Sequence, residues 1–548
     1  MSGAHAALLT AGRRVAAVVA GLLIFGFSWF YRFNDPGGTF AGLTDDHFFY
    51  VVRGWQILFG DLPVRDFVDH GAPLYYYVAA AVQWFERGTF SEIAFSVTML
   101  SAAAALTFAL AARASGSIAW GALAAFVQVL LEPRFYNYPK LLVYTMAIPL
   151  LWRFADRPDA WTRFWLAVVT AIAFLFRHDH ALFIAIAFFA LLIVTSGARW
   201  RDALRHALLY SAVTLALLTP YLLFIQLNGG IGMYFRDAAA WAARDRARAP
   251  VVWPALGDDF VAWMFYLELA LPIVALLALS ASRDGFRPQW PHAIPKLAAV
   301  AVLGLALNAG FLRHPLEARL ADPSVPHAIL LAWLMAAAVR AITGRASLPV
   351  RVGLVAFAIF AASVLIVGLG NRTPIRLQKA GLTDGMADAI ERAGRVRDQL
   401  REDWELASWR DRPGHSELID LSLYLNACTA PGDRILMQQY APQVLALARR
   451  AFAGGHADLR PGFFTTREAQ ELTLARLQRQ RVPVVLLESG DSYAQFRESF
   501  PLVTAYLDEA YTLAGTRVFD RRFDVQLFVR KGLVPRRTYE PFGWPCFS

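Results

Sequence analysis

Hydrophobic residues of this chain gather into blocks that match the thickness of a membrane. A spanning helix needs roughly 20 mostly apolar residues, because the hydrocarbon core is about 30 Å thick and a helix rises about 1.5 Å per residue. Such blocks recur between residues 15 and 369, and they are continuous runs rich in Ala and Leu. Continuous runs favour helices, since the strands of a membrane barrel alternate polar and apolar residues. We predict about 11 transmembrane helices, at 15–33, 94–112, 117–131, 140–153, 163–176, 180–195, 205–226, 258–280, 296–312, 325–341 and 350–369.

The connections between these blocks differ in charge, and this difference predicts the topology. Short basic loops are expected on the cytoplasmic side; here they lie around residues 113, 153–163, 199–205, 283–296 and 340–351. The N-terminus is then cytoplasmic. The segments expected outside are 34–93, 132–139, 177–179, 227–257, 313–324 and the tail 370–548. Residues 71–85 are apolar but short, and we predict a re-entrant or interfacial helix there, because a further span would invert every later loop.

The tail 370–548 has a different pattern, in which short apolar runs alternate with helical periodicity. Such alternation is typical of an α/β domain. Residues 434–437 and 482–487 are predicted as buried strands, and residues 517–519 and 523–530 as a final strand pair. Helices are predicted at 441–449 and 467–480. The predicted fold is therefore an α-helical multi-pass membrane protein with two domains, a transmembrane domain at 1–369 and a soluble extracytoplasmic α/β domain at 370–548.

Composition supports the membrane prediction and bears on partners. Hydrophobic residues are 57% of the 548 and charged residues 18%, against about 45–50% and about 25% in soluble domains. The net charge of +10 is explained by short basic loops, so no nucleic-acid partner is expected. The two cysteines, Cys428 and Cys546, both lie in the tail. A disulfide and two unpaired thiols both remain open at this stage.

The candidate chemistry lies in the segments predicted to face outward. Ionisable residues between membrane helices are costly and usually face a cavity or a partner. The clusters are Asp45, Asp46, Arg65, Asp69 and His70 in 34–93, then Lys140, then Arg177-His178-Asp179-His180, and finally Arg319, Asp322 and His327. Carboxylates and cations gathered at one membrane face predict a site for an anionic, membrane-borne substrate. The spacing of His178 and His180 is not a usual helical metal-ligand pattern, which favours a hydrogen-bonding role.

Three motifs of the first outer loop resemble those of a known superfamily. They are Asp45-Asp46, then Gly60-Asp61-Leu62-Pro63, then Asp69-His70-Gly71-Ala72-Pro73. In order and spacing they are similar to the GT-C-type membrane glycosyltransferases, in particular to bacterial aminoarabinose transferases and protein O-mannosyltransferase-like proteins. The resemblance covers residues 15–195 in motifs and the remainder in architecture only. This chain has Asp-Asp where relatives have Asp-Glu, and His-Gly-Ala-Pro in place of a Lys-Pro-Pro or Glu-Lys-Pro element.

This resemblance implies an inverting glycosyltransferase of the bacterial cytoplasmic (inner) membrane. The donor would be a polyprenyl-phosphate-linked sugar and the acceptor an extracytoplasmic cell-envelope glycan, lipid or protein. The catalytic outer loop is 34–93, with Asp45 as the general base and Asp46 orienting it or the acceptor. The candidates for the donor phosphate are Lys140, Arg177 and Arg319. The residues expected to orient sugar or acceptor are Arg65, Asp69, His70, His178, Asp179, His180, Asp322 and His327.

Cofactor use and one alternative function stay open. No residue set is assigned to a metal, and a divalent metal remains an open question because relatives differ in their need for one. The expected partners are the lipid-linked donor, the acceptor and membrane lipids. The alternative is a non-enzymatic transporter, flippase or binding protein for lipid-linked sugars. The chain carries no evident inverted repeat, which disfavours a transporter.

Overall fold

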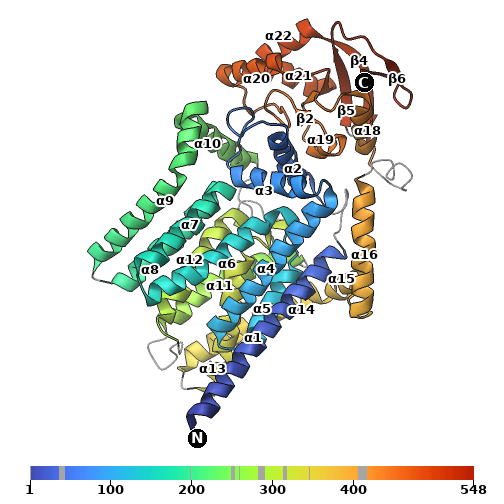
Figure 1. Cartoon of the computed structure of the whole chain (residues 1–548). Coiled ribbons are helices and arrows are strands. Elements are labelled where there is room, and N and C mark those ends of the chain that lie inside the picture. The colour runs from blue at the N-terminus through green and yellow to red at the C-terminus, as the bar shows by residue number, and fades with distance from the viewer. Residues whose placement is uncertain are drawn as a thin grey trace. The chain divides into compact units, whose positions relative to one another are not determined.

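The computed structural model describes residues 2–35, 43–197, 199–248, 253–257, 259–281, 290–312, 317–344, 346–404, 416–521 and 523–548. The chain divides into two compact units (Figure 1). Unit 1 comprises Met1–Asp35, Ala94–Tyr221 and Arg244–Gly394, and unit 2 comprises Pro36–Ile93, Leu222–Ala243 and Arg395–Ser548. The sequence predicts a domain boundary between residues 369 and 370, and that boundary stays a prediction.

Unit 1 is helical in its described residues. Its helices, some of which extend into segments of unit 2, are α1 (Ser2–Phe33), α4 (Thr89–Ser115), α5 (Ile118–Leu130), η1 (Phe135–Asn137), α6 (Tyr138–Asp156), α7 (Ala160–Phe176), α8 (His178–Ser196), α9 (Trp200–Asn228), α10 (Ile231–Arg248), α11 (Phe260–Ser280), α12 (Ala293–Leu312), η2 (Glu317–Arg319), α13 (Ser324–Thr343), α14 (Leu348–Gly370), α15 (Thr373–Lys379) and α16 (Met386–Asp403).

Eight of the described helices are long and apolar enough to cross a membrane. They are α1, α4, α8, α9, α11, α12, α13 and α14. In α1 the span begins at Gly12, and in α12 it ends at Gly310. The other three predicted spans are also helices, but α5 and α7 are shorter, and α6 carries Lys140, Arg153 and Asp156 and is outside this set. Residues 283–289 of the predicted basic loop 283–296 lie outside the described residues.

Small residues allow the helices of unit 1 to pack closely. A Cβ atom at Gly121 of α5 would lie only 2.6 Å from the side chain of Ala112 in α4, so glycine permits this approach. Helices α6, α7, α8 and α12 run side by side in Figure 1. A buried cluster that includes Ile24, Phe108 and Val129 joins α1, α4 and α5.

Unit 2 combines helices with one mixed sheet. Its strands are β1 (Arg434–Met437), β2 (Ala451–Phe452), β3 (Val484–Glu488), β4 (Tyr511–Phe519) and β5 (Phe523–Arg530), with a separate pair β6 (Arg537–Tyr539) and β7 (Trp544–Cys546). The strand order is β2-β1-β3-β5-β4, in which β2, β1 and β3 are parallel and β5 is antiparallel to β3 and β4. Its further helices are α2 (Asp45–Leu58), α3 (Pro73–Phe85), α18 (Leu418–Cys428), α19 (Pro442–Ala448), α20 (Arg467–Arg479), α21 (Gly490–Ser499) and α22 (Pro501–Ala510).

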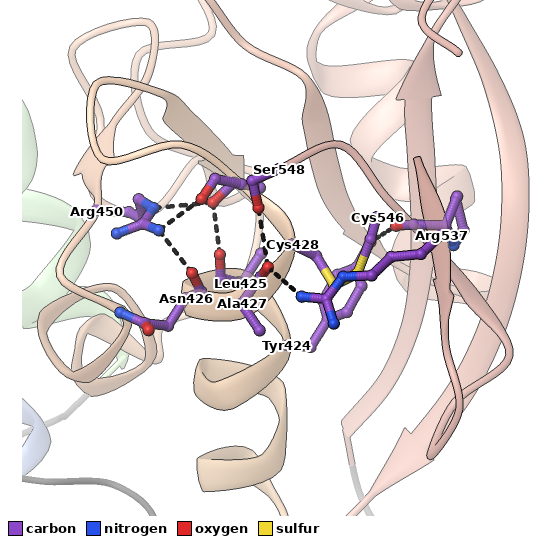
Figure 2. Close-up of a disulfide and its surroundings, with 11 residues drawn as sticks. Tyr424, Leu425, Asn426, Ala427, Cys428, Arg450, Arg537, Cys546 and Ser548 are labelled. Atoms are coloured by element: carbon purple, nitrogen blue, oxygen red, sulfur yellow. Dashed lines mark hydrogen bonds between the residues drawn. A yellow bond between two sulfur atoms is a disulfide. The ribbon is translucent and has the colours of Figure 1, made fainter. Parts of the chain in front are cut away.

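The two cysteines form a disulfide between the end of α18 and β7 (Figure 2). The last carbonyls of a helix lack partners inside the helix, and here side chains supply them. Arg450 donates to the Asn426 carbonyl at 2.8 Å, and Arg537 and Ser548 donate to the Ala427 carbonyl at 3.0 and 2.8 Å. The end of the chain is therefore fastened to α18 by a covalent bond and by hydrogen bonds.

Candidate functional site

The acidic pair opens helix α2 in unit 2. Asp45 and Asp46 occupy the first turn, after Thr44 in an extended conformation. Negative charge is favoured there, because the unpaired backbone N–H groups and the helix dipole both stabilise it. The hydroxyl of Tyr440 donates a hydrogen bond of 2.8 Å to Oδ1 of Asp46. One carboxylate of the pair is thus oriented by a side chain that lies 394 positions away.

Tyr440 is a site residue that the sequence analysis missed. Burial, together with the negative charge of Asp46, raises the pKa of its hydroxyl, so the phenol remains a donor at neutral pH. Arg460 stacks 4.5 Å from the centre of the ring. Tyr440 follows β1 by three residues, at the carboxyl end of a strand in the parallel part of the sheet. Ligands of open α/β sheets often bind at this edge, and that rule could have marked Tyr440.

A buried hydrogen-bond group secures the start of α2. Nε2 of His47 lies 3.3 Å from Oε2 of Glu92, and Gln83 donates to Oε1 of Glu92 at 3.0 Å. Gln83 also bonds to the backbone of Gly88 through both of its amide atoms. These contacts connect α2 to the end of α3 and the start of α4, and they restrict the orientation of the acidic turn next to His47.

Arg53 lies two turns further along α2 and was also missed. It is 1% exposed, and its guanidinium lies 3.5 Å from the centre of the Phe49 ring. One nitrogen donates to the Phe49 carbonyl at 2.9 Å. Its Nε has no hydrogen-bond partner and no carboxylate forms an ion pair with it among the described residues. A buried cation without a carboxylate is costly, so Arg53 is a candidate contact for an anionic substrate.

Asp69 closes the loop before α3. Its Oδ1 accepts hydrogen bonds from the backbone of Gly71 at 2.8 Å and Ala72 at 3.0 Å. Its Oδ2 accepts a hydrogen bond of 2.9 Å from the hydroxyl of Tyr234 in α10. The carboxylate folds the loop just before the helix as an Asx turn, and this occupation of both oxygens is a structural role that the sequence analysis did not predict.

His70 is enclosed by aromatic rings. The centres of the Phe49, Trp241 and Phe464 rings lie 5.1, 4.7 and 5.8 Å from its imidazole. Burial, reinforced by the charge of Arg53, lowers the pKa of His70 well below its usual value. His70 is therefore neutral at physiological pH, so that it could hydrogen-bond to a substrate but not neutralise a phosphate.

The Gly60-to-Pro63 turn is anchored by Asp61. Arg434 of β1 approaches both oxygens of this carboxylate, at 2.5 and 3.0 Å, and Gln56 donates to it at 2.7 Å. Arg65, predicted to orient substrate, bonds to the adjacent Asp66 at 2.7 Å. The Asp61 contacts join the segment 34–93 to the sheet, while the pair of Arg65 and Asp66 is partly exposed.

Unit 1 contains the other predicted site residues, at the starts of α6, α8 and α13. Nζ of Lys140 lies 2.7 Å from Oδ2 of Asp322, and Asn137 donates to Oδ1 of Asp322 at 3.1 Å. Lys140 also interacts electrostatically with Arg177 and Asp179. The structure therefore brings residues of three of the predicted clusters together within this unit.

The Arg177-His178-Asp179-His180 segment joins α7 to α8. Arg177 makes a bidentate ion pair with Asp179, at 2.7 and 2.5 Å. Nδ1 of His180 is 2.8 Å from the hydroxyl of Tyr144, and His178 stacks on Phe174 at 4.3 Å. Arg177 is half exposed in this pair, whereas His180 is buried.

Two further predicted residues of unit 1 are Arg319 and His327. Arg319, in η2, donates to the Gly310 carbonyl at 3.3 Å. His327 is 4% exposed and lines a cavity among α5, α11 and α13. Over the part of the chain that the structure describes, no three His, Cys, Asp or Glu residues form a group suited to a metal ion.

Comparison with known proteins gives similarity at the level of structure. No family model matches the chain, and no curated protein matches it. The chain is similar to the crystal structure of ArnT from Cupriavidus metallidurans bound to undecaprenyl phosphate, with a TM-score of 0.49, 13% identity, and coverage of 96% of this chain and 99% of that one. For ArnT from the same organism in the apo state the TM-score is 0.44 and the identity 13%, with coverage of 95% and 98%.

Proposed function

We propose that the protein is an inverting glycosyltransferase that moves a sugar from a polyprenyl-phosphate donor to an extracytoplasmic acceptor. The observation that supports this most is the arrangement along α2. Asp45 and Asp46 stand in its first turn, Tyr440 holds Asp46, and the buried Arg53 follows without a carboxylate partner among the described residues. A base and a cation on one helix suit a reaction in which a hydroxyl loses a proton and a phosphate leaves.

The spacing of these groups suits the size of a sugar phosphate. Asp46 and Arg53 are seven residues apart, which places them on the same side of the helix and roughly 10 Å apart along its axis. In the proposed reaction Asp45 accepts the proton of the acceptor hydroxyl, whose oxygen then attacks the anomeric carbon. The bond from that carbon to the phosphate oxygen breaks, the polyprenyl phosphate leaves with the electron pair, and the configuration inverts.

Cationic side chains would stabilise the leaving phosphate. Lys140, Arg177 and Arg319 remain our candidates from the sequence, and Arg53 joins them. Lys140 and Arg177 each pair with a carboxylate, Asp322 and Asp179. A phosphate oxygen would compete with these carboxylates for the same donors, since both are charged hydrogen-bond acceptors.

We also propose a multi-pass protein of the bacterial inner membrane, with a cytoplasmic N-terminus and an extracytoplasmic tail. The Cys428–Cys546 disulfide supports the placement of the tail, because disulfides persist in oxidising compartments and are rare in the cytosol. Membrane-impermeant thiol reagents applied to intact spheroplasts should label the tail only after reduction. Labelling that requires lysis would contradict this topology.

The test of the proposed function is sugar transfer by the full-length protein purified in detergent. A panel of polyprenyl-phosphate sugars is offered, and release of polyprenyl phosphate is measured. We expect turnover by the wild type and a loss of about 10²- to 10⁴-fold in Asp45→Asn, as is typical for removal of a general base. Asp508→Asn removes an exposed carboxylate that pairs with Arg497, and it should leave the rate unchanged.

Two results would overturn the proposal. Full activity in both Asp45→Asn and Asp46→Asn would remove the base from the first outer loop. No turnover of any donor by a folded wild type that binds these lipids would favour transport or binding instead. Arg53→Met should slow transfer from the donor. Arg53→Lys should retain part of the rate, because lysine keeps the positive charge although it loses the stacking contact.

A further inference from the structure

A cavity of about 330 Å³ lies in unit 1, at the ends of three helices that are long and apolar enough to span a membrane. Its lining includes Tyr31 near the end of α1, Phe260 at the start of α11 and Leu369 near the end of α14. Leu130, the last residue of α5, and Leu131 add to its apolar side. Spanning helices end where the hydrocarbon core meets the lipid head groups. The cavity therefore lies at that interface.

Charged side chains make up the other side of this cavity. They are Arg134, Arg372, Arg376, Glu132 and Glu317. Three arginines against two glutamates leave one positive charge in excess among the described residues of the lining. Clustered basic side chains at a membrane surface attract anionic lipid head groups. An excess positive charge beside apolar residues therefore indicates a ligand that is anionic at one end and apolar at the other.

Two of the arginines stand on one face of α15. Arg372 directly precedes this helix, and the backbone nitrogen of Arg376 donates to the Arg372 carbonyl at 3.1 Å. Residues four positions apart on a helix are neighbours on its surface, and like charges so placed repel each other. Leu377 of α15 packs against the buried cluster that includes Tyr31, so α15 is held against α1. An anion between the two guanidinium groups would relieve their repulsion.

Each of these guanidinium groups has N–H donors that are not used. Nη1 of Arg376 lies 2.6 Å from Oε2 of Glu132, whose Oε1 accepts a hydrogen bond of 2.7 Å from the hydroxyl of Tyr31. Arg372 pairs with Glu317 through its own Nη1. Within the described residues, the other N–H groups of both side chains have no protein acceptor. About half of each side chain is exposed, so these donors are open to a ligand.

We propose that this cavity binds the phosphate head group of an anionic membrane phospholipid, with Arg372 and Arg376 on the phosphate and the acyl chains along Leu131 and Leu369. Arginine suits this role because its planar guanidinium bonds to two phosphate oxygens at once. A head group with a net negative charge balances the excess positive charge, whereas a zwitterionic one adds an ammonium group beside the arginines. The site does not involve glycosyl transfer, so it stands or falls apart from the proposed function.

The test uses the full-length protein, purified in detergent and stripped of lipid. Its melting temperature is measured as dioleoylphosphatidylglycerol, dioleoylphosphatidylcholine or inorganic phosphate is added, and bound lipid is counted by native mass spectrometry. We expect saturable stabilisation by phosphatidylglycerol that exceeds the effect of phosphatidylcholine and that inorganic phosphate does not reproduce.

Two double variants test the arginines. Arg372→Gln combined with Arg376→Gln should weaken the apparent affinity for phosphatidylglycerol roughly tenfold, because charge-assisted hydrogen bonds to the phosphate are lost. The matched control, Arg467→Gln combined with Arg497→Gln, removes two exposed arginines that also pair with carboxylates. It should leave the affinity for phosphatidylglycerol unchanged.

Glu317→Gln gives a prediction of the opposite sign. It removes an exposed carboxylate that competes with the phosphate for Arg372. Binding of phosphatidylglycerol should therefore tighten roughly threefold, in line with the small free energy of an exposed ion pair. If the double variant of Arg372 and Arg376 fails to fold, the affinity of Glu317→Gln decides the question.

Three outcomes would overturn the proposal. The first is equal stabilisation by both phospholipids with no loss in the double variant of Arg372 and Arg376, as expected for a general effect of added lipid. The second is saturation of the effect by inorganic phosphate alone, which would make the cavity a site for a free anion. The third is displacement of phosphatidylglycerol by a polyprenyl phosphate, which would assign the cavity to the leaving group of the proposed reaction.

Discussion

The hydroxyl of Tyr440 donates a 2.8 Å hydrogen bond to Oδ1 of Asp46, and so connects the edge of the sheet to the acidic turn of α2. Hydrogen bonds to charged groups contribute about 1.5–3 kcal/mol. We therefore expect Tyr440→Phe to slow sugar transfer roughly 10- to 100-fold, with little change in melting temperature. The rate of polyprenyl phosphate release measures this. Tyr493→Phe, at a tyrosine that contacts the exposed Arg497, is the control, and equal rates in the two variants would refute a role for Tyr440.

The ion pair of Asp61 and Arg434 should contribute strongly to stability. Both side chains are largely buried, with 13% and 16% of their surface exposed. Removal of one member of such a pair leaves the other charge buried, so Arg434→Met should lower the free energy of unfolding by about 3 kcal/mol. The exposed pair Arg467 and Glu471 serves as the comparison, since loss of a surface pair costs less than about 1 kcal/mol. Urea unfolding followed by tryptophan fluorescence measures both, and similar losses would contradict the expectation.

Gly54 should tolerate no side chain. A Cβ atom at this position of α2 would lie 2.7 Å from the backbone nitrogen of Ala80 and 2.9 Å from the Cβ of Ala79, both in α3. Gly54→Ala must push these helices apart, with an expected loss of about 1–3 kcal/mol and slower transfer. Gly232→Ala, in α10, meets no atom within 4 Å and should have little effect on the melting temperature. Equal effects of the two changes would show that the packing of α2 on α3 does not depend on Gly54.

Acid should destabilise unit 2 through His456. Burial, reinforced by the charges of Arg476 and Arg53, lowers the pKa of this imidazole to about 3, whereas an unfolded histidine titrates near 6.5. Between these values the unfolded chain binds more protons. The contribution of His456 to stability is therefore fully present above pH ~6.5 and is lost as pH falls toward 3, by about 1.4 kcal/mol per pH unit.

The pH dependence of unfolding in His456→Gln measures this effect. Glutamine stays neutral and can still bond to Thr473, which lies 3.0 Å from Nε2 of His456. Stability should then fall less between pH 6.5 and pH 4.5 than in the wild type. His292→Asn, at an exposed position of unit 1, should retain the full acid dependence. If the stability of His456→Gln falls between pH 6.5 and pH 4.5 as much as that of the wild type, groups other than His456 cause the loss.

The local pattern of apolar residues predicts helices and strands well where a single helical or strand periodicity dominates a segment. Residues 434–437 form β1 as predicted, and the predicted helix 467–480 is α20, from Arg467 to Arg479. The apolar segment 71–85 contains the short helix α3. In contrast, the predicted loop 227–257 contains the helix α10. Its many charged residues lower its hydropathy, so an apolar pattern does not predict this helix.

The long-range contacts of the candidate site could not be predicted in this way. Nothing near Tyr234 or Tyr440 in the sequence indicates a bond to Asp69 or Asp46, because these contacts arise from tertiary packing. The clusters of charged residues in the sequence predict the acidic pair Asp45-Asp46 as a candidate site. The hydrogen-bond partners of each carboxylate cannot be predicted in this way, because they depend on the fold.

The bond between Cys428 and Cys546 turns the intervening chain into a covalent ring, with the two cysteines 118 positions apart. A protease that cuts the backbone once within this ring leaves a protein that still migrates as one piece on a denaturing gel until a reductant is added. Damage to the exposed loops of β4 to β7 would therefore not by itself release a fragment. If the tail lies outside the cytoplasm, as proposed, where no ATP-driven repair is at hand, such a ring keeps the two parts of a nicked molecule joined.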